Sequence, residues 1–147
     1  EGTGKSTDIS DDGDTGTFTL EFTIEALEDD VYVYNGAVDS AFASTSGFLY
    51  KIYKGGTLLS ATSTDSAALQ SSADTAGLGS AWFVVRQGET EDFTLTVTLN
   101  PDSSASGLYS VELDTIRFDD VADTTANDTS YELPNDAEFE TNARQID

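Results

Sequence analysis

Hydrophobic and polar residues alternate along much of this chain with the two-residue period of a half-buried β-strand. The clearest case is TFTLEFTIEAL, residues 17–27, where apolar side chains stand at every second position from Phe18 to Ala26 and Thr or Glu stands between them. A second short segment, residues 31–34, is apolar on both faces. We therefore predict two strands, joined by the polar turn Glu28-Asp29-Asp30.

The middle of the chain repeats this pattern with clear turn signals. GFLYKIYKGGTLLSATS, residues 47–63, predicts two strands joined at Gly55-Gly56, because glycine tolerates the positive φ angles of a tight hairpin. Two more strands flank Gln87-Gly88-Glu89, which predicts a hairpin or a corner between two sheets. Small residues dominate 35–46 and 64–80. We predict loops there, with one short helix as the alternative in the second segment.

The last third of the chain predicts strands of less regular pattern. In GLYSVELDTIRF, residues 107–118, the side chains of Tyr109, Val111 and Leu113 share a face. Ile116 and Phe118 are out of phase with them, which predicts a one-residue bulge. An acidic loop over 119–130 and a weaker final strand near 131–133 and Phe139 complete the prediction.

No segment shows the apolar stripe of an amphipathic helix, so the strand count decides the fold class. Seven to nine short, mostly antiparallel strands predict an all-β fold, a β-sandwich of immunoglobulin-like type. At 147 residues the chain has the size of one domain. We place this domain at residues 17–147, behind a polar, acidic arm of residues 1–16.

One stretch resembles a known kind of domain. Residues 86–101, RQGETEDFTLTVTLNP, followed by GLYSVEL at 107–113, resemble the G-E-T, alternating strand, G-x-Y-x-V run of immunoglobulin-like domains in bacterial secreted surface proteins. The resemblance covers about a third of the chain. It implies an exported protein with a structural or adhesive role. The long strand at 17–27 and its polar leader depart from a plain modular repeat of that family.

Composition excludes several functions. With 28 Asp and Glu against 6 Lys and Arg, the formal net charge of −22 repels nucleic acids and anionic membranes. Without cysteine or histidine, the chain can build no disulfide, zinc-thiolate site or Ser-His-Asp arrangement. No apolar run approaches the roughly 20 residues that span a bilayer. We expect no enzyme activity and no membrane insertion. A chain that begins at Glu1 without Met fits a processed export product and equally a shortened chain.

The acidic arm, EGTGKSTDISDDGDTG, contains three apparent motifs. Gly4-Lys5-Ser6-Thr7 lacks the earlier glycine, strand and helix of a phosphate loop. Asp14-Thr15-Gly16 spells the aspartic protease triplet but stands in a polar context. Asp8, Asp12 and Asp14 fit a calcium loop better, although Thr19 occupies the position of the bidentate glutamate. We therefore expect a solvated acidic arm and no cofactor, and the alternative is a structural Ca²⁺ bound in the arm.

The sequence signals for other candidate sites are less specific. Asp119, Asp120 and Asp123 form a second acidic cluster with the same alternatives, a cation site or a solvated surface. Sugar could stack on exposed aromatic residues, for which the candidates are Trp82, Tyr32, Tyr34 and Tyr53, but such residues also form cores. Asn127-Asp128-Thr129 is an acceptor triplet for a glycan.

Two functions fit these features. The first is a non-enzymatic subunit of an extracellular filament or cell-surface assembly, a homo-oligomer that associates through β-edges or by strand donation from the N-terminal segment. Residues 17–27 would then contribute interface side chains, namely Phe18, Leu20, Phe22 and Ile24. The alternative is a carbohydrate- or calcium-dependent adhesion module of a secreted surface protein.

Overall fold

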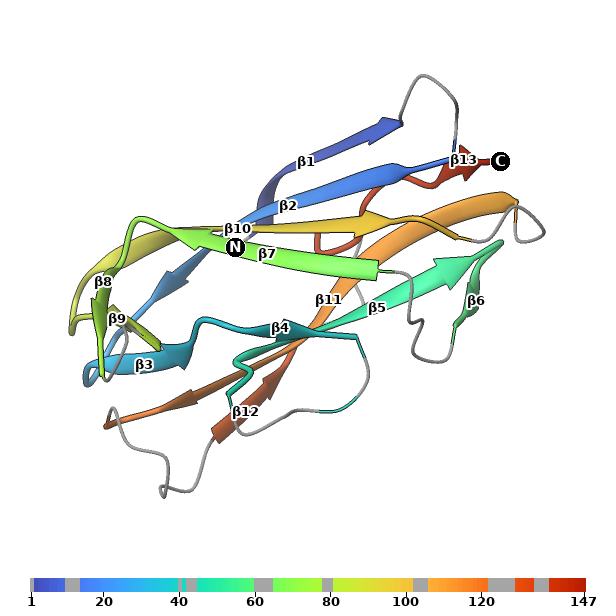
Figure 1. The fold of residues 1–147 in the computed structure, drawn as a ribbon. Coiled ribbons are helices and arrows are strands. Elements are labelled where there is room, and N and C mark those ends of the chain that lie inside the picture. Colours follow the sequence, from blue (N-terminus) through green and yellow to red (C-terminus); the bar gives the residue numbers. More distant parts are fainter. Residues whose placement is uncertain are drawn as a thin grey trace.

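The computed structural model describes residues 2–9, 14–39, 41, 45–59, 65–77, 81–101, 106–121, 129–133 and 138–147, with residues 2–7 as backbone only. These residues form an all-β sandwich of two mostly antiparallel sheets (Figure 1). Thirteen strands are found in the described ranges, more than the predicted seven to nine. The unpredicted strands are two longer ones, β1 (Gly2–Ile9) and β7 (Asp65–Ser71), and three of two or three residues, β4 (Ala37–Val38), β8 (Asp74–Ala76) and β13 (Arg144–Ile146). The described residues contain no helix long and apolar enough to cross a membrane.

The smaller sheet has four strands in the order β1-β2-β10-β7, and each neighbouring pair is antiparallel. Strands β2 and β10 are central and pair over ten consecutive positions. The bounds of the four strands are β1 (Gly2–Ile9), β2 (Gly16–Glu25), β10 (Thr90–Leu99) and β7 (Asp65–Ser71).

The larger sheet contains the other nine strands in the described residues and is organised around β11, which pairs along both edges. Its main path runs β4-β5-β11-β3-β9-β8, with β12 and β13 beside β11 and β6 beside β5. The bounds of these strands are β3 (Val31–Tyr34), β4 (Ala37–Val38), β5 (Phe48–Lys54), β6 (Thr57–Leu58), β8 (Asp74–Ala76), β9 (Trp82–Val85), β11 (Gly107–Asp119), β12 (Thr129–Glu132) and β13 (Arg144–Ile146).

The core lies between the two sheets and is formed by the inward positions of their central strands. At its centre Phe22 stacks on Phe93 with ring centroids 5.6 Å apart, and Phe48 of the opposite sheet lies 5.8 Å from Phe22. Phe83 meets Phe93 edge to face at 5.6 Å. Each fully buried large apolar side chain contributes about 1.5–3 kcal/mol relative to exposure. This aromatic cluster therefore holds the two sheets together.

Three local predictions are confirmed. Gly55 and Gly56 have φ angles of 59° and 75° and join β5 to β6 in a tight hairpin. The pairing of β11 with β5 shifts register between Leu113 and Thr115, which is the predicted bulge. Gly88 has a φ angle of 78° in the turn where the chain leaves β9 of one sheet for β10 of the other. That turn is the corner between two sheets, the second of the two predicted alternatives.

The prediction of a loop or short helix over 64–80 is wrong. Residues 65–71 form β7, which pairs with β10, and residues 74–76 form β8, which pairs with β9. The inward positions of β7 hold small or single apolar residues such as Ala67 and Leu69, so its alternation is hidden by Ser and Ala. The neighbouring strand supplies the hydrogen bonds that the sequence pattern alone does not indicate.

Part of the acidic N-terminal arm is also a strand. Residues 2–9 form β1, which pairs with β2 from Gly2↔Phe22 to Ile9↔Gly16. Polar and charged residues are common in edge strands, where they limit unwanted pairing with other chains. The arm is thus an outer strand of its own sheet, and β2 is paired along both edges within the chain.

Candidate functional site

The predicted calcium residues of the arm form no cluster in the described residues. Asp8 is exposed in β1, and its Oδ1 accepts the backbone N–H of Ile9 at 3.0 Å. Asp14 is exposed just before β2, and Asp12 lies outside the described residues. No group of three or more His, Cys, Asp or Glu side chains that could hold a metal occurs in the described ranges. Calcium binding by this arm stays a prediction.

The four residues predicted to form a subunit contact lie in the central strand β2. Phe18, Leu20 and Phe22 are buried in the core of their own chain. Ile24 is partly buried and lines an apolar pocket of about 240 Å³ together with Phe139 and residues of β3, β11 and β12. In this structure these side chains stabilise their own sandwich. A contact between subunits folded in this way would use other surfaces.

The aromatic residues considered for sugar binding are largely engaged within the fold. Trp82 is buried and stacks on Tyr34 with ring centroids 3.5 Å apart. The hydroxyl of Tyr53 donates to Glu112 Oε2 at 2.6 Å, and Tyr32 is partly buried in β3. Trp82 is therefore a core residue, and these four rings offer no shared stacking platform on the surface.

The smaller sheet ends in an open strand on each side. Within the described residues neither β1 nor β7 pairs with a further strand beyond its one neighbour. Three successive antiparallel pairings separate them, so β1 and β7 run in opposite directions. An unpaired strand edge presents backbone N–H and C=O groups to any strand of matching direction. These two edges, β1 and β7, are candidate assembly surfaces.

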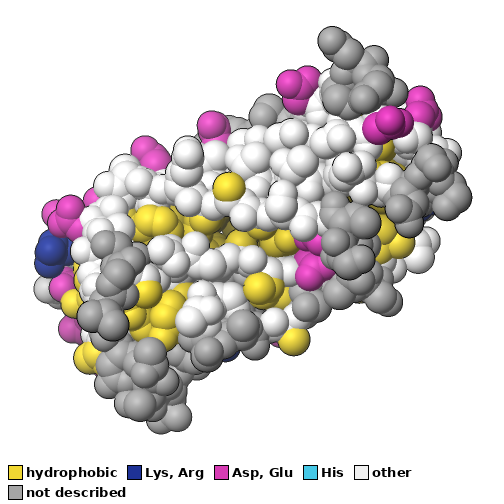
Figure 2. All heavy atoms as spheres, in the orientation of Figure 1, with side chains coloured by type: hydrophobic (Ala, Val, Ile, Leu, Met, Phe, Trp, Pro, Cys, Tyr) yellow, Lys and Arg dark blue, Asp and Glu magenta, His cyan; other side chains and the backbone are white. Residues whose placement is uncertain are grey.

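The flank beside β7 also exposes apolar surface. Figure 2 shows hydrophobic side chains in an uneven band between β7 of the smaller sheet and the β4–β5 part of the larger one. Partly buried residues that pack against the core occur on the elements that border this flank, namely Ala37, Leu59, Ala67 and Leu69. Apolar surface next to an open strand favours contact with another chain.

Strand β7 carries little charge for such an acidic protein. Asp65 is its single charged residue, and the remaining six are Ser, Ala, Leu and Gln. The hydroxyl of Tyr50, from the opposite sheet, donates to Asp65 Oδ2. Burial and this hydrogen bond raise the pKa of Tyr50 well above its usual value. The one carboxylate of β7 is thus tied to the other sheet, and the outward positions of the strand, Ser66, Ala68 and Gln70, are neutral.

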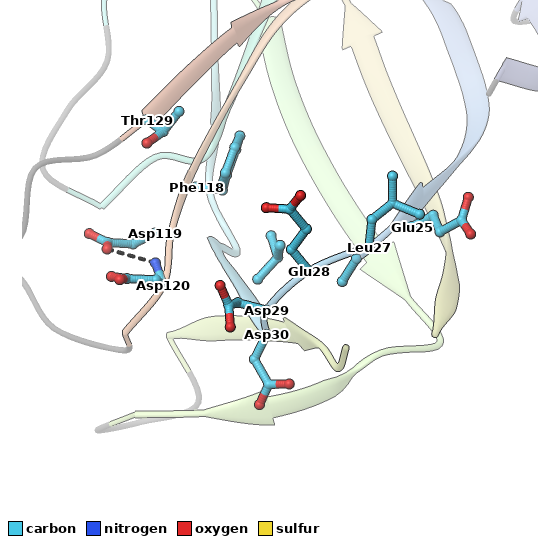
Figure 3. Close-up of a pocket in the computed structure, with 11 residues that line it drawn as sticks. Glu25, Leu27, Glu28, Asp29, Asp30, Phe118, Asp119, Asp120 and Thr129 are labelled. Carbon is cyan, nitrogen blue, oxygen red and sulfur yellow. Dashed lines mark hydrogen bonds between the residues drawn. The ribbon is translucent and has the colours of Figure 1, made fainter. Parts of the chain in front are cut away.

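A second candidate site is a groove of about 670 Å³ at one end of the sandwich. The chain that leaves β2 toward β3 forms part of its wall, and the end of β11 forms another part (Figure 3). Carboxylates dominate its charged lining and come from Glu25, Glu28, Asp29, Asp30, Asp119 and Asp120. Because no Lys or Arg is among the described residues that line it, we call it the acidic groove.

Asp119 is the unusual residue of the acidic groove. Its side chain is buried, with 4% relative exposure, and its Oδ1 accepts the backbone N–H of Asp120 at 2.7 Å. Its Oδ2 is buried and has no hydrogen-bond partner among the described residues. Burial, followed by contact with the Asp120 side chain, raises the pKa of Asp119 above its usual value. Asp119 and Asp120 belong to the second acidic cluster of the sequence, and the third member of that cluster, Asp123, lies outside the described residues.

The acidic groove brings together two segments that the sequence did not connect. Glu28, Asp29 and Asp30 were predicted only to form a polar turn, and nothing in their spacing relates them to residues ninety positions later. The signal that could have found them is charge density, since both segments are acidic runs at strand ends. The candidate glycan acceptor Asn127 lies outside the described residues.

A third polar cluster lies on the face of the larger sheet where β5 and β11 are paired. Glu112 is buried there with 4% exposure, accepts the Tyr53 hydroxyl, and neighbours Glu140 through an isolated bridge. Glu140 Oε1 accepts the hydroxyl of Ser110 at 2.8 Å. Hydrogen bonding to Glu112 raises the pKa of Tyr53 to about 12. These carboxylates have protein partners, so the cluster is best explained as a stabilising network.

Comparison with family models, curated proteins and solved structures finds no match for this chain. Its function therefore has to be argued from its own residues.

Proposed function

We propose that this protein is a non-enzymatic structural subunit of an extracellular filament or cell-surface assembly, in which the β7 edge of one subunit pairs with the β1 edge of the next. The observation that carries the proposal is the pair of open edges on the four-stranded sheet. The resemblance to bacterial surface domains and the acidic composition support an exported location.

Strand direction makes the two edges complementary. Because β7 and β1 run in opposite directions within one subunit, a second copy in the same orientation brings its β1 antiparallel to the first copy's β7. The two surfaces differ, so the contact is head to tail and each added subunit leaves both edges available again. Such heterologous contacts produce open filaments unless a rotation closes them into a ring.

Charge sets the conditions for assembly. Subunits with a net charge of −22 repel each other, and this repulsion is weakest where the contacting strand is neutral, as it is at the outward positions of β7. Salt screens the remaining repulsion, since the Debye length falls from about 10 Å at 0.1 M to about 3 Å at 1 M ionic strength. Assembly should therefore increase with salt concentration.

Donation of residues 17–27 to a neighbour is the less favoured form of this proposal. Those residues already pair along both edges in their own chain, whereas the N-terminal strand β1 is the outer one and has a free side for a partner. The alternative function, an adhesion module for carbohydrate or calcium, receives support from the acidic groove. For carbohydrate it loses support, because Trp82 is buried.

The experiment compares three variants by negative-stain imaging and sedimentation at about 1 M NaCl. Ala68→Glu puts a charge on the exposed side of β7, and a deletion of residues 1–9 removes β1. Asn100→Glu adds the same charge at an exposed position outside any strand and serves as the control. We expect filaments from the parent protein and the control, and none from the other two.

Mixing the two edge variants gives the sharpest result. The Ala68→Glu chain keeps a working β1 and the deletion variant keeps a working β7, so the mixture should form one-to-one pairs that grow no further. Filaments from Ala68→Glu as abundant as those of the parent, or a parent protein that stays monomeric at every salt concentration, would show that the proposal is wrong.

A further inference from the structure

The acidic groove contains a buried charge that the fold itself does not neutralise. Asp119 has a relative exposure of only 4%. Oδ2 of its carboxylate has no hydrogen-bond partner among the described residues. A buried polar atom without a partner destabilises a protein, and more so when it is charged. Native structures tolerate such an atom mainly where a ligand, ion or water meets it.

The surroundings of Asp119 increase this need for a positive charge. The Asp120 carboxylate lies beside it, as Figure 3 shows, and the lining contributed by the chain after β2 adds Glu28, Asp29 and Asp30. Arg86 pairs with Asp30 at 3.9 Å and with Asp74 at 3.4 Å. Arg86 does not line the groove.

We propose that the acidic groove binds a calcium ion through the carboxylates of Asp119 and Asp120. The donor set consists of oxygen atoms alone, which suits a hard cation. Calcium accepts six to eight oxygen ligands in irregular geometry, including backbone carbonyls and waters, whereas magnesium demands near-octahedral geometry. Since no group of three acidic side chains that could hold a metal is found in the described ranges, backbone carbonyls and water must complete the coordination.

Calcium at this place would have a structural effect. It would offset the negative charge at the end of β11 and so weaken the repulsion between this end and the acidic turn that leads from β2 to β3, which lines the same groove. With few protein ligands the affinity should fall in the range of extracellular modules, about 0.1–1 mM. This inference is independent of the proposed assembly, because none of the groove residues belongs to β1 or β7.

The test is calorimetric titration of the full chain with CaCl₂ at constant ionic strength, set by KCl. The variants Asp119→Asn and Asp120→Asn remove one ligand charge each and keep the side-chain shape. Asp14→Asn is the matched control, since it removes one exposed carboxylate of the acidic arm, the other calcium candidate in the sequence. We expect saturable binding by the parent and by Asp14→Asn, and at least about tenfold weaker binding by both groove variants.

Thermal unfolding provides an independent measurement. Without calcium, Asp119→Asn should be more stable than the parent at neutral pH, because it removes a buried charge; with calcium, the melting temperature of the parent should rise and that of Asp119→Asn should not. Calcium binding that survives in both groove variants, binding lost in Asp14→Asn, or a parent that shows no saturable binding up to about 10 mM would overturn the proposal. The last result would mean that a proton, and not calcium, neutralises Asp119.

Discussion

The two sheets of this sandwich differ in regularity and in what they bury. In the smaller sheet, β2 and β10 pair over ten positions without a register shift, and all their buried side chains are apolar. In the larger sheet, β11 shifts register next to Leu113 and buries four polar residues, namely Ser110, Glu112, Thr115 and Asp119. One sheet is a regular apolar layer, and the other contains most of the buried polar chemistry.

The difference shows where each kind of function can lie. A regular sheet with an apolar inner face specifies its register strongly and leaves only its two edges for contact with other chains. A sheet with a bulge and many short strands brings polar groups from distant segments together, some satisfied, as at Glu112, and some not, as at Asp119. The assembly proposal thus belongs to the smaller sheet and the calcium proposal to the end of the larger one.

The largest effect should follow from removing a large side chain from the apolar core face of the smaller sheet. Phe22 has 2% exposure and packs against Phe93 and Phe48, so Phe22→Ala should lower the free energy of unfolding by about 3–5 kcal/mol. Thr96→Ala on the other face of the same sheet should change it by less than about 0.5 kcal/mol. Urea denaturation measures both. A loss below about 1 kcal/mol in Phe22→Ala would contradict the assignment of this layer as the core.

A smaller effect should distinguish the tolerance of the two sheets for an added methyl group. A Cβ atom at Gly47, beside the larger sheet, would lie 2.5 Å from the carbonyl oxygen of Tyr34, which is backbone and cannot move aside. At Gly16, in the smaller sheet, the closest atom is Cδ1 of Ile146 at 2.6 Å, the end of a flexible side chain. Gly47→Ala should destabilise by about 1–3 kcal/mol, and Gly16→Ala by less. Equal losses, measured by thermal unfolding, would contradict this difference.

The smallest effect concerns the polar network of the larger sheet. Tyr53→Phe removes the hydrogen bond to Glu112 and should lower the free energy of unfolding by about 1 kcal/mol at pH 8. This bond raises the pKa of Tyr53 from 10.0 to about 12, so the folded state holds the phenol proton to higher pH than the unfolded state does. The contribution is therefore complete below pH 10.0 and is lost as the pH rises through about 12.

The measurement is urea unfolding of parent and Tyr53→Phe at several values between pH 8 and pH 12. The difference between their free energies of unfolding should decrease as the pH rises. Titration of Tyr50 affects both proteins alike and does not contribute to this difference. Tyr131→Phe, at a side chain with 57% exposure, is the control for loss of a hydroxyl and should stay within about 0.5 kcal/mol of the parent at pH 8. If the difference in the free energy of unfolding between parent and Tyr53→Phe stays constant with pH, the hydroxyl of Tyr53 does not contribute through its hydrogen bond to Glu112.

The sequence predicts strands and turns correctly where apolar and polar residues alternate clearly or where glycine marks a turn. The alternation of residues 17–27 identified β2 and its buried Phe18, Leu20 and Phe22, because a half-buried strand must place apolar groups at every second position. The Gly55-Gly56 hairpin and the bulge after Leu113 were predictable for the same reason. Strand β7 was missed because its inward residues are small, and a run of Ser, Ala and Thr resembles a loop.

The candidate sites were less predictable than the fold. Asp119 and Asp120 were visible as an acidic pair, but so were many others among 28 acidic residues. What distinguishes Asp119 is burial without a partner at Oδ2, and burial depends on which segments cover a residue. The open edge of β7 was likewise invisible, because a strand is an edge only when the sheet order is known.

By itself the sequence determined the all-β class, the alternating strand of residues 17–27, the Gly55-Gly56 hairpin, a turn at residues 87–89, and an acidic composition without thiol or imidazole chemistry. These follow from local periodicity, glycine conformation and composition, which act within a few residues. The tertiary structure decided that residues 2–9 pair with β2, that β1 and β7 are the open edges with opposite directions, and that Asp119 is buried beside the turn of residues 28–30. Those features depend on contacts between segments far apart in the chain, and no local pattern encodes which distant strand or carboxylate becomes a neighbour.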